Sequence, residues 1–433
     1  MNRFDNIHLG LSQEDALRIL RLRPEDLEAA SDYYMAASHL INFPGNTSVV
    51  ALMEFINQSS QEQSVRLAQR KAVEVLGRLG ATEAIASIGT CLQSDDPYLV
   101  ENSAWALREL NCTDQSLHQM MVQHLDNPIQ NRRVLIQSLA GLGVGSAVKA
   151  IAALESDEKP GVRGAALCAV ARMTGCREHL HRLENHLTLP NQMDRQSAIQ
   201  DIIDADAGFL LPSVLKTPVS PVFRMRALKE LWPQNKMQFE GLDLTTSLDG
   251  LMLDEPGDLV LVHRYDEEQL DTFLIQEFFG TDFSRSYLAL QTLGERPTED
   301  LWPILKEQWQ AEAYNDYGAH YFFIRLFGIQ KRWPTEAVPL LSEWLLEAVE
   351  NQRPQFTKSK AAALLSLATV NPDLCKQHLW EWADAEQTQW WECRYASAMA
   401  FEKVHVTAPY DGPWWVDPHP FVKARWARHH TND

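Results

Sequence analysis

Five prolines recur through the first half of the chain at intervals of 30 to 32 residues, and each separates one apolar segment from the next. They are Pro97, Pro128, Pro160, Pro190 and Pro221. A second series keeps the same period just past an apolar run: Gly80, Asn111, Gly143 and Gly175. Glycine and asparagine tolerate a positive φ, so these four positions are predicted to end helices in the left-handed conformation. Two helices in a period of about 31 residues are typical of HEAT-like repeats, which predicts an all-α fold built as a curved α-solenoid.

Composition and charge exclude several classes of protein. The formal net charge of −19 argues against a nucleic-acid partner, because phosphate backbones are bound by clustered lysine and arginine. No stretch approaches the roughly 20 apolar residues that cross a membrane, and the first five residues lack the apolar run of a signal peptide. We therefore expect a cytoplasmic protein with no membrane partner. The six cysteines show no CxxC spacing, which predicts neither a metal site nor a disulfide framework.

Four segments are predicted from changes of pattern along the chain. Residues 1–64 are expected to form N-terminal capping helices, and residues 65–233 the regular HEAT-like repeats. Residues 234–283 are rich in glycine and acid and include a short β-like run at 259–263, which predicts an irregular insertion or hinge. Residues 284–433 are expected to form a second helical array, and eleven of the thirteen tryptophans lie there. Its predicted helices span about 299–310, 316–328, 335–350, 357–369, 373–385 and 388–403, followed by a capping helix within 418–426.

The sequence lacks the common catalytic signatures, since it contains no GxxxxGK[ST], GxGxxG, HExxH or GxSxG motif. Instead, a charged row follows the repeat prolines, and Arg132, Arg133 and Arg163 belong to it. Two interpretations stay open for these arginines. They form a structural ladder with acids before the turn, such as Asp96 and Asp126, or some of them face a groove where guanidinium groups bind a carboxylate ligand.

The densest polar and aromatic cluster is the segment from Tyr314 to Tyr321. A helix beginning near residue 315 or 316 would place Tyr317, His320 and Tyr321 on one face, with Asp316 at its head. Imidazole and phenol groups there could transfer protons and stack on a ligand. The alternative is that Asp316 only caps the helix, that His320 is a buried structural histidine and that the tyrosines belong to the core.

Several segments resemble a known family. Residues 72–80 (AVEVLGRLG) and 95–107 (DDPYLVENSAWAL) are similar to the HEAT-like repeats of the E/F-type phycobilin lyases of cyanobacterial phycobilisomes. Residues 31–37 (SDYYMAA) and 419–426 (HPFVKARW) resemble the long single-chain branch that acts on phycoerythrin α subunits. The combination of Glu101 with Trp105 makes this resemblance more specific than the repeat motif alone.

The resemblance implies an enzyme that attaches a linear tetrapyrrole to a cysteine of a phycoerythrin α subunit through a thioether. The bilin is then a substrate, and no permanent cofactor is expected. Tyr317, His320 and Asp316 are the candidates for proton transfer. The candidates for binding the bilin are Tyr314, Tyr321, Glu101, Trp105, Arg132, Arg133 and Arg163.

Three interpretations stay open at this point. The first is a lyase that attaches phycoerythrobilin unchanged or isomerises it to phycourobilin during attachment. The second is a non-catalytic chaperone for bilin or for a phycobiliprotein on the same scaffold, and the third is a HEAT-like scaffold that binds only protein partners.

Overall fold

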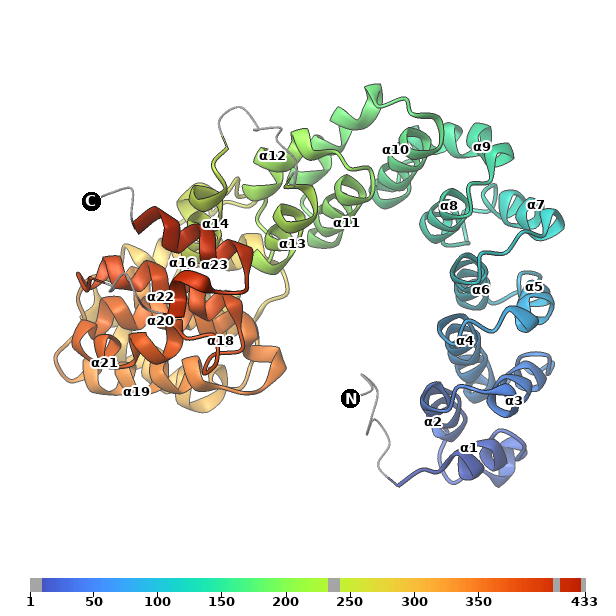
Figure 1. The fold of residues 1–433 in the computed structure, drawn as a ribbon, viewed down its shortest axis with the longest axis horizontal. Helices are drawn as coiled ribbons and strands as arrows, with labels where there is room; N and C mark the ends of the chain where they lie inside the picture. The colour runs from blue at the N-terminus through green and yellow to red at the C-terminus, as the bar shows by residue number, and fades with distance from the viewer. Residues whose placement is uncertain (1–9, 233–241, 408–412, 430–433) are drawn as a thin grey trace. The chain divides into compact units, whose positions relative to one another are not determined.

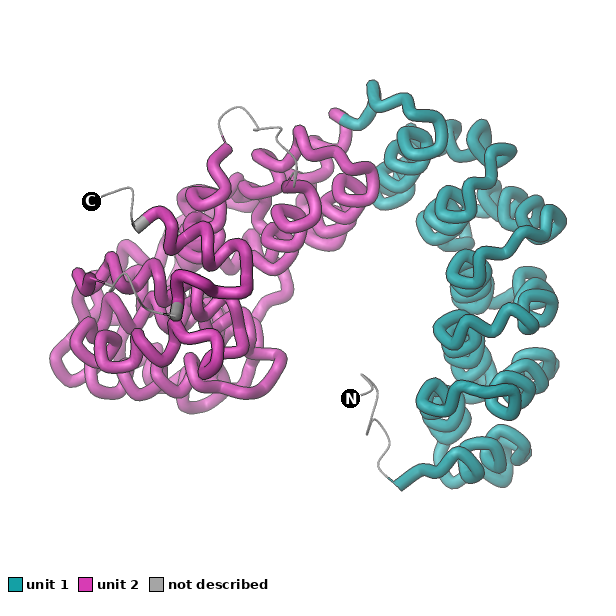
Figure 2. Tube along the Cα trace, viewed as in Figure 1, with its two compact units in different colours: residues 1–180 teal, residues 181–433 magenta. Residues whose placement is uncertain are grey.

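The computed structural model describes residues 10–232, 242–407 and 413–429, and the regular secondary structure of these residues is all helical, with no strand among them. The predicted all-α class is therefore confirmed (Figure 1). The chain divides into two compact units, Met1–Leu180 and His181–Asp433 (Figure 2). The division does not coincide with the expected segment boundaries at 64, 233 and 283, and those boundaries stay predictions.

Unit 1 is a stack of helix pairs. One row of neighbouring helices consists of α2 (Asp32–His39), α4 (Gln63–Arg78), α6 (Pro97–Glu109), α8 (Arg132–Gly141) and α10 (Pro160–Thr174). The second row, on the other side of the connecting turns, consists of α3 (Asn46–Ile56), α5 (Ile85–Cys91), α7 (Gln115–His124) and α9 (Val148–Ala153) (Figure 1). Helix α1 (Gln13–Ile19) packs on α2 at the beginning of the stack, and the Ser12 hydroxyl caps it by accepting from the Asp15 amide.

The two periodic series have the structural roles that the sequence predicts. Gly80, Asn111, Gly143 and Gly175 have φ values of 69°, 51°, 67° and 79°, so all four are left-handed. The repeat prolines open α6, α10 and α13, or lie in the turns before α8 and α11. Proline suits the first helical position because its missing N–H would have no partner there. Between these marks, leucines of each repeat such as Leu76, Leu107 and Leu139 are fully buried.

Unit 2 begins with three helices of the proline-marked repeat region, α11 to α13, and continues with a second helical array. It contains α11 (Gln192–Asp204), α12 (Leu211–Leu215), α13 (Pro221–Leu231), α14 (Leu244–Leu253), α15 (Asp271–Gln276), α16 (Phe283–Gly294), α17 (Thr298–Gln308), α18 (Ala319–Ile329), α19 (Ala337–Glu350), α20 (Thr357–Val370), α21 (Pro372–Ala383), α22 (Trp391–Lys403) and α23 (Pro420–His429). Helix α20 packs between α18 and α22, and ten of its fourteen residues are buried. Gly328 permits the approach of α18 to α20, because a Cβ there would lie 2.2 Å from Ser366 Oγ.

The segment at 234–283, expected to be an irregular insertion or hinge, contains helices as well as irregular backbone. Residues 234–241 lie outside the described residues, and α14 and α15 follow within the segment. The β-like run at 259–263 forms no strand. Isolated hydrogen bonds hold its backbone: the Val260 amide donates to the Lys216 carbonyl at 2.8 Å, and the Val262 amide donates to Ser284 Oγ at 3.0 Å. A strand needs a second strand beside it, and the neighbours here are helix ends.

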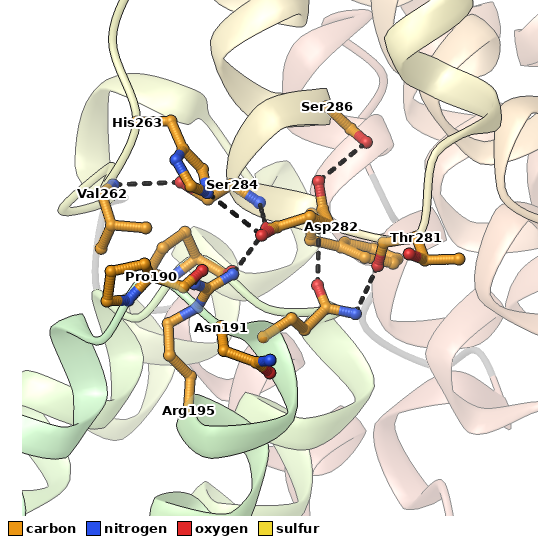
Figure 3. Close-up of polar contacts among 12 residues, drawn as sticks. Pro190, Asn191, Arg195, Val262, His263, Thr281, Asp282, Ser284 and Ser286 are labelled. Atoms are coloured by element: carbon orange, nitrogen blue, oxygen red, sulfur yellow. Dashed lines mark hydrogen bonds and ion pairs between the residues drawn. The ribbon is translucent and has the colours of Figure 1, made fainter.

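An arginine of α11 fastens the end of this segment to the repeats. The Arg195 side chain is fully buried and forms an ion pair of 2.6 Å with Asp282, as Figure 3 shows. Arg195 also donates to the Leu189 and Pro190 carbonyls at 2.8 Å each, while His263 Nε2 lies 3.1 Å from the other Asp282 oxygen. Burial opposes ionisation of Asp282, but Arg195 and His263 hold its pKa below the usual value. This arginine is therefore structural.

Candidate functional site

The three arginines proposed to bind propionate all have partners within unit 1. Arg132 forms an ion pair of 2.7 Å with Asp157, and both side chains are largely buried. Arg133 donates to the Gly161 carbonyl at 2.8 Å, and Arg163 donates to the Asp157 carbonyl at 2.7 Å. These contacts are those of the structural ladder. A role of these arginines in binding bilin stays a prediction.

Glu101 and Trp105 lie on α6, also in unit 1, and both are half-buried. The Arg78 guanidinium lies over the Trp105 ring, 5.6 Å from its centroid, and covers part of one face. The neighbouring Asn102 side chain donates to the Arg70 carbonyl at 3.1 Å. The other candidates belong to unit 2, so the structure does not bring all of the predicted residues together in one unit.

The predicted stripe of Tyr317, His320 and Tyr321 is wrong in its geometry. Helix α18 begins at Ala319, so Tyr317 precedes the helix and is 62% exposed, and Tyr314 is 50% exposed. Asp316 Oδ1 accepts from the Gly318 and Ala319 amides, each at 2.8 Å. These two bonds close a turn ahead of α18, so the regular helix begins three residues after Asp316 and the register expected from spacing fails.

His320 is buried in the core of unit 2. Its side chain is 3% exposed, its Nδ1 lies 3.0 Å from Ser359 Oγ, and its ring packs against Trp309 and Phe356 at 5.1 and 4.6 Å. Burial, together with the positive charges of Arg353 and Lys358, lowers its pKa to about 3. This environment keeps the imidazole neutral near pH 7. It matches the alternative of a buried structural histidine.

Tyr321 is also buried, but its position is more informative. Its hydroxyl donates to Asp254 Oδ2, as does the Tyr287 hydroxyl at 2.6 Å, and the Arg224 guanidinium contacts the other Asp254 oxygen. Burial and then the Asp254 charge raise the pKa of Tyr321 far above its usual value, so it stays a neutral phenol. This closed network lies at the wall of a pocket to which Tyr321 contributes.

The pocket has a volume of about 470 Å³ and lies entirely within unit 2. Helices α13, α14, α18, α20 and α22 provide its wall, as does the turn before α20. Its apolar lining includes Val222, Met225, Leu251, Met252, Ala361 and Ala362. Its charged lining consists of Arg226, Lys229, Lys358, Glu230 and Glu392. A pocket of this size with an apolar wall and a few charged groups suits an amphipathic small molecule.

Lys358 lies beside two of the predicted tyrosines, Tyr317 and Tyr321, and Tyr321 lines the pocket with it. Its Nζ lies 5.2 Å from the Tyr317 ring centroid and 5.3 Å from that of Tyr321, with Phe283 at 5.0 Å. Burial lowers the pKa of Lys358 to about 8, so the ammonium is still mostly charged at neutral pH. Sequence reasoning missed Lys358, because one lysine in the first turn of a helix carries no signal that separates it from a solvated one.

Glu392 is the second functional candidate that sequence reasoning missed. It lies in the first turn of α22, and its Oε2 is a buried oxygen that has no hydrogen-bond partner among the described residues. Burial raises its pKa above the usual value. An acid in the first helical turn usually complements the helix dipole at the surface, so the sequence alone indicates only that ordinary role.

Within residues 10–232, 242–407 and 413–429, no helix is both long and apolar enough to cross a membrane. The described residues also contain no group of three or more His, Cys, Asp or Glu side chains that could hold a metal ion.

Comparisons with known proteins identify the family. No family model matches the chain. The bilin biosynthesis protein CpeY of Synechococcus sp. (strain WH8020) is 43% identical over 376 residues, which cover 87% of this chain and 90% of that protein. The uncharacterized phycocyanin operon protein Y of Pseudanabaena tenuis (strain PCC 7409) is 34% identical over 404 residues, covering 93% and 94%. Among solved structures, a chain in the complex of CpcE and CpcF of phycocyanin lyase from Nostoc sp. PCC7120 is similar, with a TM-score of 0.46 and 22% identity. The alignment covers 56% of this chain and 95% of that chain. The extent of similarity to CpeY shows that the chain belongs to the family of this bilin biosynthesis protein, which confirms the resemblance to the E/F-type phycobilin lyases.

Proposed function

We propose that the chain is a phycobilin lyase that joins a linear tetrapyrrole to a cysteine of a phycoerythrin α subunit in the cyanobacterial cytoplasm. Membership in the family of a bilin biosynthesis protein supports the reaction class. The observation that carries the proposal in the structure is the pocket of unit 2, which combines an apolar wall with three cationic side chains.

The pocket matches the chemistry of a bilin. The conjugated rings of the pigment need apolar surface, and Met225, Leu251 and Met252 provide it. The two propionates need cations. Arg226 and Lys229 are exposed on α13 and form no ion pair with the described residues, and Lys358 lines the same pocket from α20. Guanidinium and ammonium groups bind carboxylates through charge-assisted hydrogen bonds.

The attacking thiol is supplied by the partner subunit in this proposal. Cys91, Cys112, Cys168, Cys375 and Cys393 are all buried. Burial raises the pKa of Cys375 and that of Cys393 to about 12, which disfavours the reactive thiolate. Cys176 is exposed but lies in unit 1 and does not line the pocket. The enzyme then works chiefly by orientation, because a bilin held beside a docked cysteine reacts as if at high local concentration.

The test is coexpression of the chain with a phycoerythrin α subunit and a bilin pathway. Covalent attachment is measured as pigment that stays with the denatured subunit. Replacing Arg226, Lys229 and Lys358 together by Gln should lower the yield by roughly 100-fold, as expected when several charge-assisted contacts are lost. Arg70→Gln is the matched control, because it removes a ladder arginine of unit 1 that pairs with Asp96 and should leave yield per folded protein unchanged.

The outcomes separate the alternatives. Pigment that binds the wild-type chain but never becomes covalent indicates a chaperone. No binding of pigment at all indicates a protein scaffold. The absorption spectrum of the denatured product reports whether attachment includes isomerisation, because isomerisation to phycourobilin shortens the conjugated system.

A further inference from the structure

The Lys358 ammonium lies among aromatic rings at the pocket and has no hydrogen-bond acceptor in the described part of the chain. Its Nζ is 5.0 Å from the ring centroid of Phe283, and Tyr317 and Tyr321 are nearly as close. The side chain is half-buried and lines the pocket from α20. Aromatic faces attract an ammonium, but they leave its N–H groups without an oxygen acceptor. These N–H groups are therefore left for a molecule in the pocket.

The acids nearest to Lys358 are bound by other donors. Asp254 is held by the Arg224 guanidinium and by two tyrosine hydroxyls, and Asp316 accepts from two backbone amides. Among the described residues, neither carboxylate forms an ion pair with Lys358. Lys358 is also the second residue of α20, where the positive end of the helix dipole opposes a cation. Local stability does not explain a lysine at this position, which indicates a role toward the pocket.

Lys358 is the charged group of this pocket that is best suited to move a proton. The Arg226 guanidinium stays protonated in proteins. Lys229 and Glu230 are exposed on α13, where bulk water takes part in any proton exchange. The Glu392 carboxyl already accepts hydrogen bonds from its own helix. Lys358 alone combines partial burial in an aromatic environment with N–H groups that no acceptor holds.

We propose that Lys358 is the general acid of bilin attachment, and that its ammonium donates a proton to the conjugated system of the bound bilin as the acceptor cysteine adds to it. This inference rests on the proposed lyase function. Lys358 is then a catalytic residue in contact with the tetrapyrrole, whereas Arg226 and Lys229 bind the propionates. The rings of Phe283 and Tyr321 limit the access of water to the ammonium, which directs the proton to the pigment.

The proton transfer completes the addition of a thiol to a double bond. The sulfur of the cysteine thiolate bonds to the exocyclic carbon of an end ring, and the π electrons of that double bond move into the conjugated system. One N–H bond of Lys358 breaks, and its proton bonds to the conjugated system where this electron pair arrives. The neutral amine then takes up the proton that the thiol released to solvent. No leaving group departs, and no oxidant or reductant is used.

The titrating groups around Lys358 favour this role near neutral pH. Burial lowers the pKa of Lys358 to about 8, while the charges of Asp316 and Asp254 act in the opposite direction. Tyr321 stays a neutral phenol and His320 a neutral imidazole, so neither adds a charge. The other charged groups nearby are Arg226, Lys229 and Glu230 on α13, Glu392 on α22 and Arg353 in the turn before α20. The ammonium is thus the main form at pH 7 and yet releases its proton readily, as a general acid must.

The test is the rate at which phycoerythrobilin bound to the purified chain is attached to a phycoerythrin α subunit, measured as pigment that stays with the denatured subunit. Lys358→Ala should slow attachment by roughly 100-fold, the size of effect typical of a lost general acid. Added ethylammonium should restore a large part of the rate, because it can occupy the vacated space and donate a proton. Tetramethylammonium has the same charge and suits an aromatic site, but it has no N–H proton and should not restore the rate.

Lys358→Arg separates charge from proton transfer, since a guanidinium keeps the charge and does not release a proton. We expect this variant to bind phycoerythrobilin as tightly as the wild type, by absorption titration, and still to attach it slowly. In the wild type the rate should pass through a maximum with pH, because the acceptor thiol ionises as pH rises while Lys358 loses its proton. Lys376→Arg is the matched control, since Lys376 pairs with Asp373 on α21 and does not line the pocket.

Three results would overturn the inference and leave the lyase function intact. They are a wild-type rate in Lys358→Ala or Lys358→Arg, equal rescue of Lys358→Ala by the two ammonium ions, and loss of pigment binding in Lys358→Ala, which would make Lys358 a binding residue only. A wild-type chain that attaches no bilin to any phycobiliprotein subunit would instead overturn the proposed function itself.

Discussion

The two units use arginine in different ways. In unit 1 the ion pairs join adjacent repeats: Arg70 binds Asp96, 26 residues further along the chain, and Arg132 binds Asp157 in the same way. In unit 2 the buried Arg195 reaches Asp282, 87 residues away, and Arg224 reaches Asp254 across α14. The ladder of unit 1 is thus a property of the repeat, whereas the pairs of unit 2 fasten non-repeating segments onto the helices.

This difference indicates where function can arise in a repeat protein. A regular stack offers each polar group a partner in the adjacent repeat, so few groups are left for a ligand. In unit 2 the departure of 242–282 from the repeat removes such partners from α13, and a pocket forms between α13, α20 and α22. The charged groups that line it, Arg226 and Lys358 among them, are those that the fold does not use.

The largest expected effect is on the buried network of unit 2. Asp254→Asn should lower the free energy of unfolding by about 3–5 kcal/mol, because it leaves Arg224 buried without a counter-charge. Asparagine keeps the size of the side chain and tolerates the left-handed backbone at φ 48°. Urea denaturation of the whole chain, followed by tryptophan fluorescence that reports mainly on unit 2, measures this loss.

Asp157→Asn in unit 1 is the comparison for this prediction. Its partner Arg132 has an exposed fraction of 11%, and water can replace part of the lost contact. We expect a loss of about 1–2 kcal/mol, typical of a hydrogen bond to a charged group. Equal losses in the two variants would show that the ladder and the network are energetically alike.

The second expected effect is on stability in acid. The pKa of His320 is about 3 in the folded chain, against its usual 6.5, so below pH 6.5 the unfolded state binds a proton that the folded state does not. Stability from this group is therefore complete above pH 6.5 and is lost as pH falls toward 3, by about 1.4 kcal/mol per pH unit. The measurement is the free energy of unfolding of wild type minus that of His320→Gln, from pH 7 to 4.5. A difference is needed because His419 also has a lowered pKa, and its contribution is present in both proteins and cancels.

If the two pH profiles are parallel, His320 is not held neutral by burial. A ring packed between Trp309 and Phe356 leaves a cavity when it is removed, so we expect His320→Ala to be destabilised.

The sequence predicted the regular part of the fold in detail. The left-handed residues at 80, 111, 143 and 175 were identified from one chemical constraint, positive φ, that recurs with the repeat. The later helices were also located closely; for example, the helix expected at 357–369 is α20 at Thr357–Val370. Periodic burial and local caps determine both, and both can be recognised without knowledge of distant contacts.

The site could be predicted only in part. The cluster at 314–321 does border the pocket, through Tyr321 and the contact of Lys358 with Tyr317. Its internal geometry failed because Asp316 closes a turn before α18, and the helix begins three residues after Asp316, at Ala319. Glu392 and Lys358 could not be identified, since their environment depends on helices that are more than 100 residues away along the chain, such as α13.

The third expected effect concerns how closely α18 and α20 approach. Gly328→Ala should cost about 1–3 kcal/mol, because its Cβ would overlap Ser366, whose hydroxyl donates to the Ile324 carbonyl. Gly250→Ala on α14 is the control, since nothing lies within 4 Å of the added methyl and helix propensity favours alanine. Thermal unfolding of both variants measures the difference. A Gly328→Ala variant as stable as Gly250→Ala would show that α20 can shift without loss.

The smallest expected effect lies in the turns of unit 1. Gly80→Ala should lower stability by about 1 kcal/mol, because alanine is strained at φ 69° although open space surrounds the position. Asn111→Gly should be neutral, since glycine adopts the φ of 51° found there at no steric cost. Chemical denaturation of the two variants tests whether backbone conformation, and not side-chain contact, sets the choice of residue at these caps. If Asn111→Gly is as destabilising as Gly80→Ala, then Asn111 contributes a specific contact, and the regularity of unit 1 rests on more than the left-handed turn.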